Sequence, residues 1–302
     1  MTNSPLNQTT TNQKINMVSP IWVIQGGKQI YTSTPYGIMG IINVTPDSFF
    51  DGDMAFSTKK SIGRALGLRR SGADILDIGA ESSRPGAQAL QDNEEISRLL
   101  PVLAGLKHCA DACIISIDTY HAKTAAIALQ QGASIINDIS ACRIEPELLD
   151  VLVSYKPGYI LMHGQETVET LQKRNSQTDI RKDVMDFFEK KLNMLVKAGL
   201  PENRIVLDPG IGFGKSPRDN ITLLTHAEEW KSFNRPILTG ISMKSFFSAL
   251  FNCKLEERAS LTQIATALLH TKGVFWHRVH DVVQTKKTLE MSSLLTGLEK
   301  HA

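Results

Sequence analysis

The sequence predicts a (β/α)8 barrel, also called a TIM barrel, because short apolar runs alternate with helix-like stretches eight times along its 302 residues. At least seven of the eight runs end in a polar side chain. In this fold the carboxyl ends of the strands form the rim that carries the active site. The polar residues at the strand ends are therefore the first candidates for a functional site.

The predicted strands have the length of buried parallel strands. In chain order they are Gly37–Asn43, Ala73–Gly79, Cys113–Asp118, Ala133–Asp138, Tyr159–His163, Arg204–Asp208, Pro236–Ser242 and Val274–Asp281. Helix-like stretches follow them; in Ile180–Ala198 the apolar residues recur every three or four positions before a stop at Gly199. The other predicted helices are Ser57–Arg70, Glu94–His108, Ala122–Gln131, Glu145–Ser154, Arg218–Lys231, Glu257–Thr271 and Thr285–Glu299.

A β-hairpin is predicted ahead of the first barrel strand. Ile21–Ile24 and Lys28–Thr32 flank Gly26-Gly27, which is a two-residue turn signal. We expect this hairpin to plug the amino-terminal end of the barrel. Residues 1–20 are rich in Thr, Asn, Gln and Ser and are expected to be a flexible leader, whereas residues 21–302 contain no linker and are expected to form one domain.

The composition is that of an ordinary globular protein. Lys plus Arg (33) nearly balance Asp plus Glu (31), and no basic run rises above that balance, so a nucleic-acid partner is not expected. No apolar stretch of about 18 residues exists, and the first residues lack the apolar core of a signal peptide, so we expect a cytoplasmic protein without membrane contact. The four cysteines show neither a disulfide framework nor a metal-ligand spacing.

Two of the connections after predicted strands are long. Thr45–Phe56 and Ala80–Gln91 follow the first and second strands, and each contains Pro, Gly and several polar residues. Loops of this length at a barrel rim usually cover or bind a ligand. The alternative is a tolerated surface insertion in each case.

A polar cluster is predicted inside the mouth of the barrel. Asp118, Asn137 and Asp208 come from the ends of the third, fourth and sixth strands. Buried carboxylates need partners, and a flat heterocycle with several N–H donors on one edge, such as an aminopyrimidinone, would supply them. Lys244, just past the seventh strand, would pair with these acids or with a ring carbonyl. The alternative is an internal salt-bridge cluster that binds no ligand.

The eighth strand carries a candidate anion site. Side-chain alternation places Arg278 and His280 on one face and His277 on the other, which excludes a His277–His280 metal pair. A guanidinium beside an imidazole suits a phosphate oxygen. The alternative is that Arg278 pairs with Asp281 or a helix terminus. Because Arg278 and the acids lie on different strands, binding of a phosphate-free heterocycle is expected to be independent of Arg278.

A glycine-rich segment follows the sixth strand. Asp208–Lys215 contains three glycines in six residues, but its spacing differs from that of a Walker-type phosphate loop. We therefore expect it to form a tight wall around a flat ligand, with Phe213 in the pocket.

These segments resemble the signatures of the dihydropteroate synthases, a folate-pathway enzyme family. The similarity covers roughly residues 21 to 295 in the family's order. The matching segments are Ile38–Gly52, Asp77–Gly86, Ser116–Thr119, Ile135–Ser140, Leu207–Lys215, Ser242–Phe246 and Arg278–Val282. The resemblance implies a barrel that joins a dihydropterin diphosphate to p-aminobenzoate with Mg2+ and loss of diphosphate. It also implies a homodimer formed through the outer helices, and a protein of the kind that sulfonamides target.

The resemblance also implies roles for individual residues. Asn43 would bind the magnesium ion and, with Lys244, Arg278 and His280, would form the catalytic set. The pterin would be held by Asp118, Asn137, Asp208 and Lys244 in a slot lined by Met162 and Phe213. The diphosphate would be held by Ser83, Arg278 and His280. The p-aminobenzoate would be enclosed by Phe49, Arg84, Pro85 and Ser242.

Three positions depart from the family pattern. Met243 stands where the family has an arginine that is expected to stack on the pterin, which removes a cation–π contribution of about 0.5–2 kcal/mol. Ser83 replaces a threonine, and His163-Gly164 replaces a His-Met pair. Two alternatives to an active synthase stay open: a pterin-dependent methyltransferase barrel, and a pterin-binding paralogue with impaired catalysis.

Overall fold

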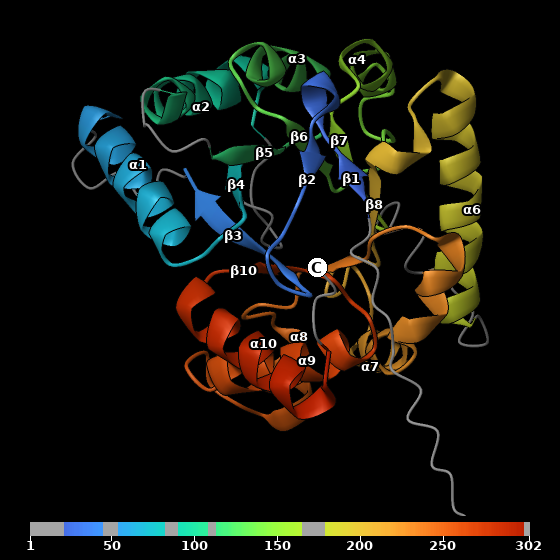
Figure 1. Cartoon of the computed structure of the whole chain (residues 1–302). Helices are drawn as coiled ribbons and strands as arrows, with labels where there is room; N and C mark the ends of the chain where they lie inside the picture. Colours follow the sequence, from blue (N-terminus) through green and yellow to red (C-terminus); the bar gives the residue numbers. More distant parts are fainter. Residues whose placement is uncertain (1–20, 45–53, 82–89, 108–112, 165–178, 299–302) are drawn as a thin grey trace, which may run out of the picture.

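Eight parallel strands form one closed sheet in the computed structural model, which describes residues 21–44, 54–81, 90–107, 113–164 and 179–298 (Figure 1). Hydrogen-bonded neighbours follow the order β8-β7-β6-β5-β4-β3-β10-β9. A parallel bridge between Leu207 and Ile237 joins β8 to the start of β9 and closes the ring. The strands are β3 (Gly37–Asn43), β4 (Ile75–Gly79), β5 (Ile114–Asp118), β6 (Ile135–Asp138), β7 (Gly158–Met162), β8 (Ile205–Asp208), β9 (Leu238–Thr239) and β10 (Trp276–Val279).

Helices surround the strands (Figure 1). Local signals set their ends: α6 starts after Asp179, whose carboxylate accepts the N–H of Arg181 at 3.0 Å, and ends at Gly199 with a φ of 112°. The α-helices are α1 (Met54–Arg70), α2 (Asp92–Lys107), α3 (Ala122–Gln130), α4 (Leu148–Tyr155), α6 (Ile180–Ala198), α7 (Pro217–Thr225), α8 (Phe246–Phe251), α9 (Arg258–Thr271) and α10 (Val282–Thr296). The 3-10 helices are η1 (Gln25–Gly27), η4 (Glu202–Arg204) and η5 (Ala227–Phe233).

The predicted barrel is confirmed, with differences in its last third. The seventh strand is shorter than Pro236–Ser242, because the chain turns where the N–H of Lys244 bonds to the carbonyl of Ile241 at 3.3 Å. The predicted helix Arg218–Lys231 is divided into α7 and η5 at His226, whose φ of −111° and ψ of 28° are not helical. The short helix α8 was not predicted.

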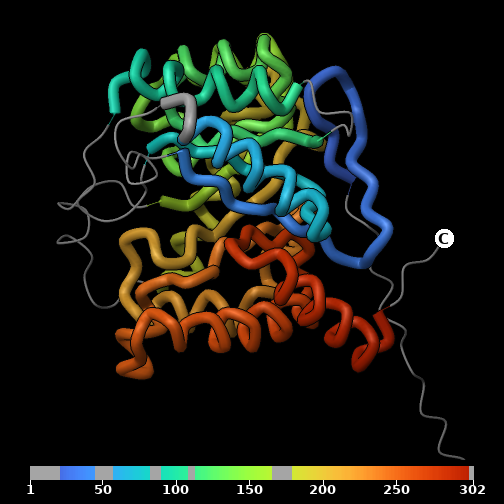
Figure 2. Tube along the Cα trace, turned by 90° about the vertical axis from the view of Figure 1, so that its left-hand side faces the viewer, coloured from blue at the N-terminus to red at the C-terminus, as the bar shows by residue number. Residues whose placement is uncertain are grey.

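The amino-terminal hairpin plugs one end of the barrel, as predicted (Figure 2). It pairs β1 (Trp22–Val23) with β2 (Gln29–Ile30) in antiparallel register. Its turn is the 3-10 segment η1, which is longer than the expected two residues and has positive φ at both of its glycines. The ring of Trp22 contacts that of Trp276 edge to face at 5.4 Å between centroids, and its Nε1 donates to the carbonyl of Arg204 at 2.9 Å.

The apolar core therefore has two parts. An outer part lies between the strands and the helices, and an inner part fills the barrel next to the hairpin. The inner part needs Gly37, because a Cβ there would lie 2.3 Å from the ring of Trp276. Because the inner core fills only the hairpin end, the opposite end of the same strands is left for polar side chains. Among the described helices, none combines the length and the hydropathy that crossing a bilayer would require.

Candidate functional site

Charged side chains meet inside the carboxyl end of the barrel. Arg278 of β10 donates from Nε to Asp77 Oδ2 and from Nη2 to Asp118 Oδ2, both at 2.6 Å. Asn137 of β6 donates from Nδ2 to the same oxygen of Asp77 at 3.1 Å. Three strands on one side of the barrel and β10 thus supply a single hydrogen-bonded cluster, which we name the acid–arginine cluster (Asp77, Asp118, Asn137 and Arg278).

The position of Arg278 corrects one expectation. It was expected to act independently of the acids, yet it is bonded to two of them. Arg278 is level with Met39 of β3, which is level with Ile75 of β4. Asp77 lies two residues further toward the mouth, within reach of a long side chain that extends along the barrel interior. The alternative partner Asp281 instead caps α10 by accepting the N–H of Gln284 at 3.0 Å.

Asp77 belongs to the polar residues near the strand ends that were the first candidates, but the sequence assigned it no role in the site. Its side chain is fully buried, and its Oδ1 has no hydrogen-bond partner among the described residues. It lies in register between Ile41 and Ser116. The available signal was a carboxylate within an apolar strand, two residues before the strand ends, on the face that points inward.

Burial controls the charge state of the cluster. Loss of water raises the pKa of Asp118 to about 7 against the opposing attraction of Arg278, and the negative charge of Asp77 adds to the increase. Burial also works against the positive charge of Arg278, but Asp77 and Asp118 together hold its pKa above the usual arginine range. The cluster therefore keeps a permanent cation beside a carboxyl group that gains or loses a proton near neutral pH.

Asp208 and Lys244 line the side of the mouth opposite Asp77. Asp208 ends β8, and its Oδ1 accepts the N–H of Gly210 at 2.8 Å, while burial raises its pKa. The Lys244 ammonium lies 3.8 Å from the centroid of the Phe213 ring, a cation–π contact. Burial and, to a smaller extent, the positive charge of Arg278 together lower the pKa of Lys244 to about 8, against the attraction of Asp208. The protein therefore only partly offsets the charges of the Asp208 carboxylate and the Lys244 ammonium.

The glycine-rich segment after β8 forms a tight turn beside them. The Lys215 ammonium donates to the carbonyl oxygens of His163 and Gly210 at 2.8 Å each and to that of Phe213 at 3.4 Å. Gly210 has a φ of 64°, and a Cβ there would lie 2.1 Å from the His163 carbonyl oxygen. Met162 is buried in β7, in register with Asp208. A cation and a glycine thus fix the backbone that carries Phe213.

Ser242 and His280 form a pair at the rim. Ser242 Oγ lies 3.0 Å from His280 Nδ1 and accepts the N–H of His280 at 3.3 Å. His277 lies on the other face of β10, as predicted. It is buried beside His270, with ring centroids 6.2 Å apart, and burial lowers its pKa to about 3. It is therefore a neutral residue of the outer core.

Comparisons with known proteins identify the family of this chain. A family model described as "Pterin binding enzyme" matches residues 39–280. A dihydropteroate synthase of Streptococcus pyogenes is 38% identical over 260 residues, which are 85% of this chain and 95% of that protein. One of Bacillus subtilis is 37% identical over 254 residues, 84% and 86% of the two chains. The chain belongs to the dihydropteroate synthase family.

The solved structures of dihydropteroate synthases share the fold. That of Xanthomonas albilineans with 4-aminobenzoic acid has a TM-score of 0.82 and 33% identity, and covers 92% of this chain and 98% of that one. That of Anaplasma phagocytophilum with bound 6-hydroxymethylpterin-monophosphate has a TM-score of 0.79 and 33% identity, covering 86% and 98%. The predicted family and fold are thus confirmed.

Some of the residues expected from the dihydropteroate synthase pattern are placed by the structure and others are not. Asn43 ends β3 with an exposed side chain. Met243 is half-buried in the left-handed region with a φ of 60°; its N–H donates to Thr262 Oγ1 at 3.1 Å and its carbonyl accepts from Arg258 Nη1 at 3.2 Å. Four of the expected site residues lie outside the described part of the chain: Phe49, Ser83, Arg84 and Pro85.

Proposed function

We propose that this protein is a working dihydropteroate synthase, which condenses 6-hydroxymethyl-7,8-dihydropterin diphosphate with p-aminobenzoate to give 7,8-dihydropteroate and diphosphate. The observation that carries the proposal is the convergence of Asp118, Asn137 and Asp208 on the barrel mouth with an arginine and a lysine beside them. A relative from Xanthomonas albilineans, 28% identical, is solved in complex with 7,8-dihydropteroate. The ligands of the relatives match the chemistry of this mouth.

The pterin edge would bind to the carboxylates and the amide. An aminopyrimidinone presents N–H donors next to a carbonyl, and Asn137 offers a donor and an acceptor at once. Asp208, whose second oxygen is not engaged by Gly210, would accept from the ring, and Lys244 would donate to the ring carbonyl. Charge-assisted hydrogen bonds of this kind are worth about 1.5–3 kcal/mol each.

Arg278 would link the pterin to its leaving group. It is held by Asp77 and Asp118, and 15% of its side chain stays exposed toward the mouth. His280 stands two residues further along the same strand and is oriented by Ser242. A guanidinium and an imidazole in this position would stabilise the negative charge that gathers on the diphosphate as it leaves.

Magnesium would assist at Asn43. This residue supplies one exposed amide oxygen at the end of β3, a ligand type that Mg2+ accepts. Since Mg2+ usually keeps waters and takes substrate phosphates as further ligands, a single protein oxygen fits a site that forms with the diphosphate. When bound, the ion would supply positive charge to the leaving group.

The chemical step needs no strong base. The carbon–oxygen bond to the diphosphate breaks, the amine nitrogen of p-aminobenzoate bonds to the exocyclic carbon, and one N–H proton leaves to water or to the diphosphate. An aromatic amine is already neutral at pH 7, so the protein contributes orientation and charge stabilisation. Phe49, Ser83, Arg84 and Pro85 are proposed to complete the p-aminobenzoate and phosphate contacts. Sulfonamides, one of which is bound in a Yersinia pestis relative of 32% identity, are proposed to compete there.

We also propose a cytoplasmic homodimer. Cys142 and Cys253 carry free thiols, which suits a reducing compartment. Large apolar side chains are exposed on α9 and α10, which are joined by the hydrogen bond from Thr288 to Gln263 at 2.9 Å. The most exposed of them are Ile264, Leu268, Met291, Leu294 and Leu295. Light scattering of the purified protein tests the dimer, and Leu294→Asp should convert it to a monomer.

The decisive assay is diphosphate release from the dihydropterin diphosphate with and without p-aminobenzoate. A synthase releases diphosphate faster when p-aminobenzoate is present and forms dihydropteroate in equal amount. Release that does not respond to p-aminobenzoate would indicate an impaired paralogue. Transfer of a methyl group from a methylated folate, without diphosphate release, would indicate a methyltransferase.

A further inference from the structure

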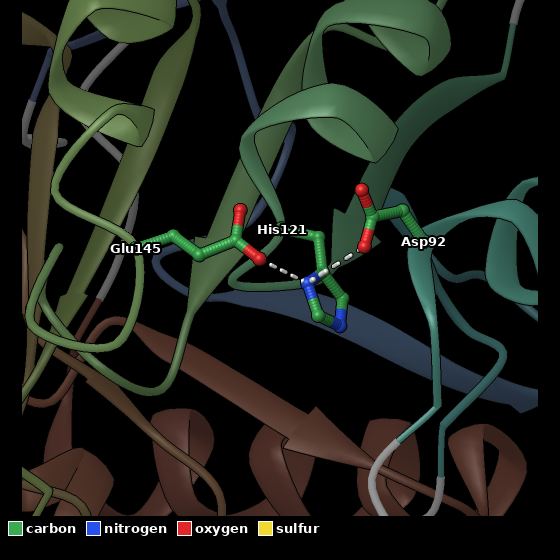
Figure 3. Close-up of side chains that lie close together, drawn as sticks. All are labelled: Asp92, His121 and Glu145. Atoms are coloured by element: carbon green, nitrogen blue, oxygen red, sulfur yellow. Dashed lines mark hydrogen bonds and ion pairs between the residues drawn. The ribbon is translucent and has the colours of Figure 1, made fainter.

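A second polar cluster lies at the carboxyl rim, outside the acid–arginine cluster. Figure 3 shows the His121 imidazole between the carboxylates of Asp92 and Glu145. His121 Nδ1 is 2.5 Å from Glu145 Oε1 and 3.7 Å from Asp92 Oδ1. Asp92 begins α2, His121 precedes α3 and Glu145 precedes α4, so three successive connections of the barrel meet at one point. We name these three residues the rim triad.

Negative charge dominates around the rim triad. Glu81 Oε2 lies 3.9 Å from His121 Nε2, and the buried Glu95 also attracts the imidazole. One histidine therefore faces four carboxylates, and in the described part of the chain no lysine or arginine forms an ion pair with any of the four. Such an excess of carboxylates is costly near the interior unless a cation offsets it.

The donor atoms are held in place by further bonds. The second oxygen of Glu145 accepts the N–H of Ala122 at 2.7 Å, so Oε1 is turned toward the imidazole. The hydroxyl of Tyr120 donates to both oxygens of Glu81 at 3.1 Å. Each residue of the rim triad offers one ligand atom, and the three atoms lie within 4.8 Å of one another. This spacing lets a single ion contact all three after small side-chain rotations.

An independent observation comes from the other nitrogen of the ring. The side chain of His121 is more than nine-tenths buried, and its Nε2 has no hydrogen-bond partner among the described residues. A metal ion on Nδ1 would leave the ring proton on Nε2, directed at Glu81. A histidine that binds a metal with one nitrogen usually donates from the other to a carboxylate. The Glu81 carboxylate, whose Oε2 is 3.9 Å from Nε2, would take that outer position after moving within hydrogen-bond distance.

We propose that the rim triad is a binding site for a divalent transition-metal ion of the class of Zn2+ or Mn2+, separate from the magnesium at Asn43. One imidazole and two carboxylates form a mixed nitrogen and oxygen set, which these ions accept and Mg2+ does not favour. The ion ties the start of α2 to the residue before α3 and to the connection after β6. It acts as a structural brace of the rim and takes no part in the condensation, so the inference does not depend on the proposed function.

The test is metal binding to the full-length protein after removal of metals by a chelator. Titration with Zn2+ alone, and in a second series with Mn2+ alone, is followed by calorimetry without substrates or phosphate. The expected result is one site per chain and a rise in Tm of roughly 5 °C at saturating metal. Co2+ bound at the same stoichiometry should show visible absorption bands that report on coordination.

Variants then locate the ion. Asp92→Asn and Glu145→Gln should each weaken binding at least tenfold, with the exposed Glu147→Gln as the matched control. Asn43→Ala should leave the site intact, since it lies on another strand. The absence of binding by all of these ions would overturn the proposal. The proposal would also be overturned if Asp92→Asn and Glu145→Gln both bound the metal as tightly as wild type and had the wild-type Tm without metal. Because Asp92 is 41% exposed at its side chain, its variant should fold even where His121→Gln does not.

Discussion

The two ends of the barrel use the same strands for opposite purposes. At the amino end, the hairpin residue Trp22 packs against Trp276 in an apolar inner core. At the carboxyl end, Arg278, only two residues after Trp276, holds the carboxylates of Asp77 and Asp118. The difference teaches that a parallel barrel separates stability from chemistry along its axis. A substitution at the amino end should change the free energy of unfolding, and one at the carboxyl end should change binding and turnover.

The largest effect is expected at the carboxyl end from Arg278→Ala. It leaves Asp77 and Asp118 buried without their cation and removes charge stabilisation from the leaving group, so turnover should fall by about 10²–10³. Since Arg278 is bonded to Asp118, affinity for a phosphate-free pterin should fall as well. Calorimetry and diphosphate release measure the two effects, with Arg181→Ala, at a partly exposed arginine of α6, as control. Unchanged affinity for the phosphate-free pterin would show that pterin binding does not depend on Arg278, as the sequence had suggested.

At the amino end, Trp22→Ala should lower the free energy of unfolding by about 3–5 kcal/mol. It empties the centre of the plug and removes the bond to the Arg204 carbonyl. Denaturant unfolding measures the loss, and Tyr31→Ala, at an exposed hairpin position, should stay within about 0.5 kcal/mol of wild type. The KM for p-aminobenzoate of the folded fraction should not change. A large KM change would show that the two ends are coupled.

Asp208→Asn should weaken pterin binding with little loss of stability. The substitution replaces one acceptor by a donor against the same ring edge, at a cost of about 1.5–3 kcal/mol, or about 10- to 150-fold in affinity. Calorimetric titration with a pterin measures it, and Asp186→Asn on the exposed face of α6 serves as the control. Wild-type affinity in the Asp208 variant would remove this residue from the pocket.

The pH dependence of pterin binding should report on Lys244. Because its pKa is lowered to about 8, the ammonium is present below that pH and is lost above it. Affinity should therefore fall by up to about tenfold per pH unit above pH 8. The folded protein binds fewer protons than the unfolded chain between about pH 8 and the ordinary lysine pKa, so stability should rise with pH in that window. Lys244→Arg, which stays charged, should flatten the affinity profile; an equally steep profile in that variant would assign the titration to another group.

The smallest effect is expected from Met243→Arg. Restoring the family arginine should add about 0.6–2 kcal/mol of stacking on a bound pterin, or about threefold to thirtyfold in affinity. The position has a positive φ in either variant, so backbone strain should be unchanged. Lower turnover in the variant would show that the pocket has adapted to methionine.

The fold could be predicted from the sequence because the spacing of apolar residues and the positions of strand ends are local properties of each segment. Gly37–Asn43 was predicted with the observed bounds, and alternation alone placed His277 outside the barrel and Arg278 inside. What the sequence could not supply was the distance between side chains from separate strands. The role of Asp77 and the contact between Arg278 and Asp118 depend on the stagger of neighbouring strands, which no single segment encodes. Likewise, the length of the hairpin turn depended on how Gly26 and Gly27 rotate.

The closure between β8 and β9 has a consequence for the ligand. Among the residues that the structure describes, one bridge, Leu207–Ile237, joins these strands, with the N–H of Leu207 donating to the carbonyl of Pro236 at 3.0 Å. It is the seam of the barrel with the fewest interstrand bonds, and Asp208 and Lys244 stand on its two sides. A ring bound by both residues would bridge the two sides of that seam from inside the barrel. A bound substrate would thereby stabilise the closure of the barrel. Without it, local opening of the barrel is expected first at the seam between β8 and β9, beside the proposed pterin site.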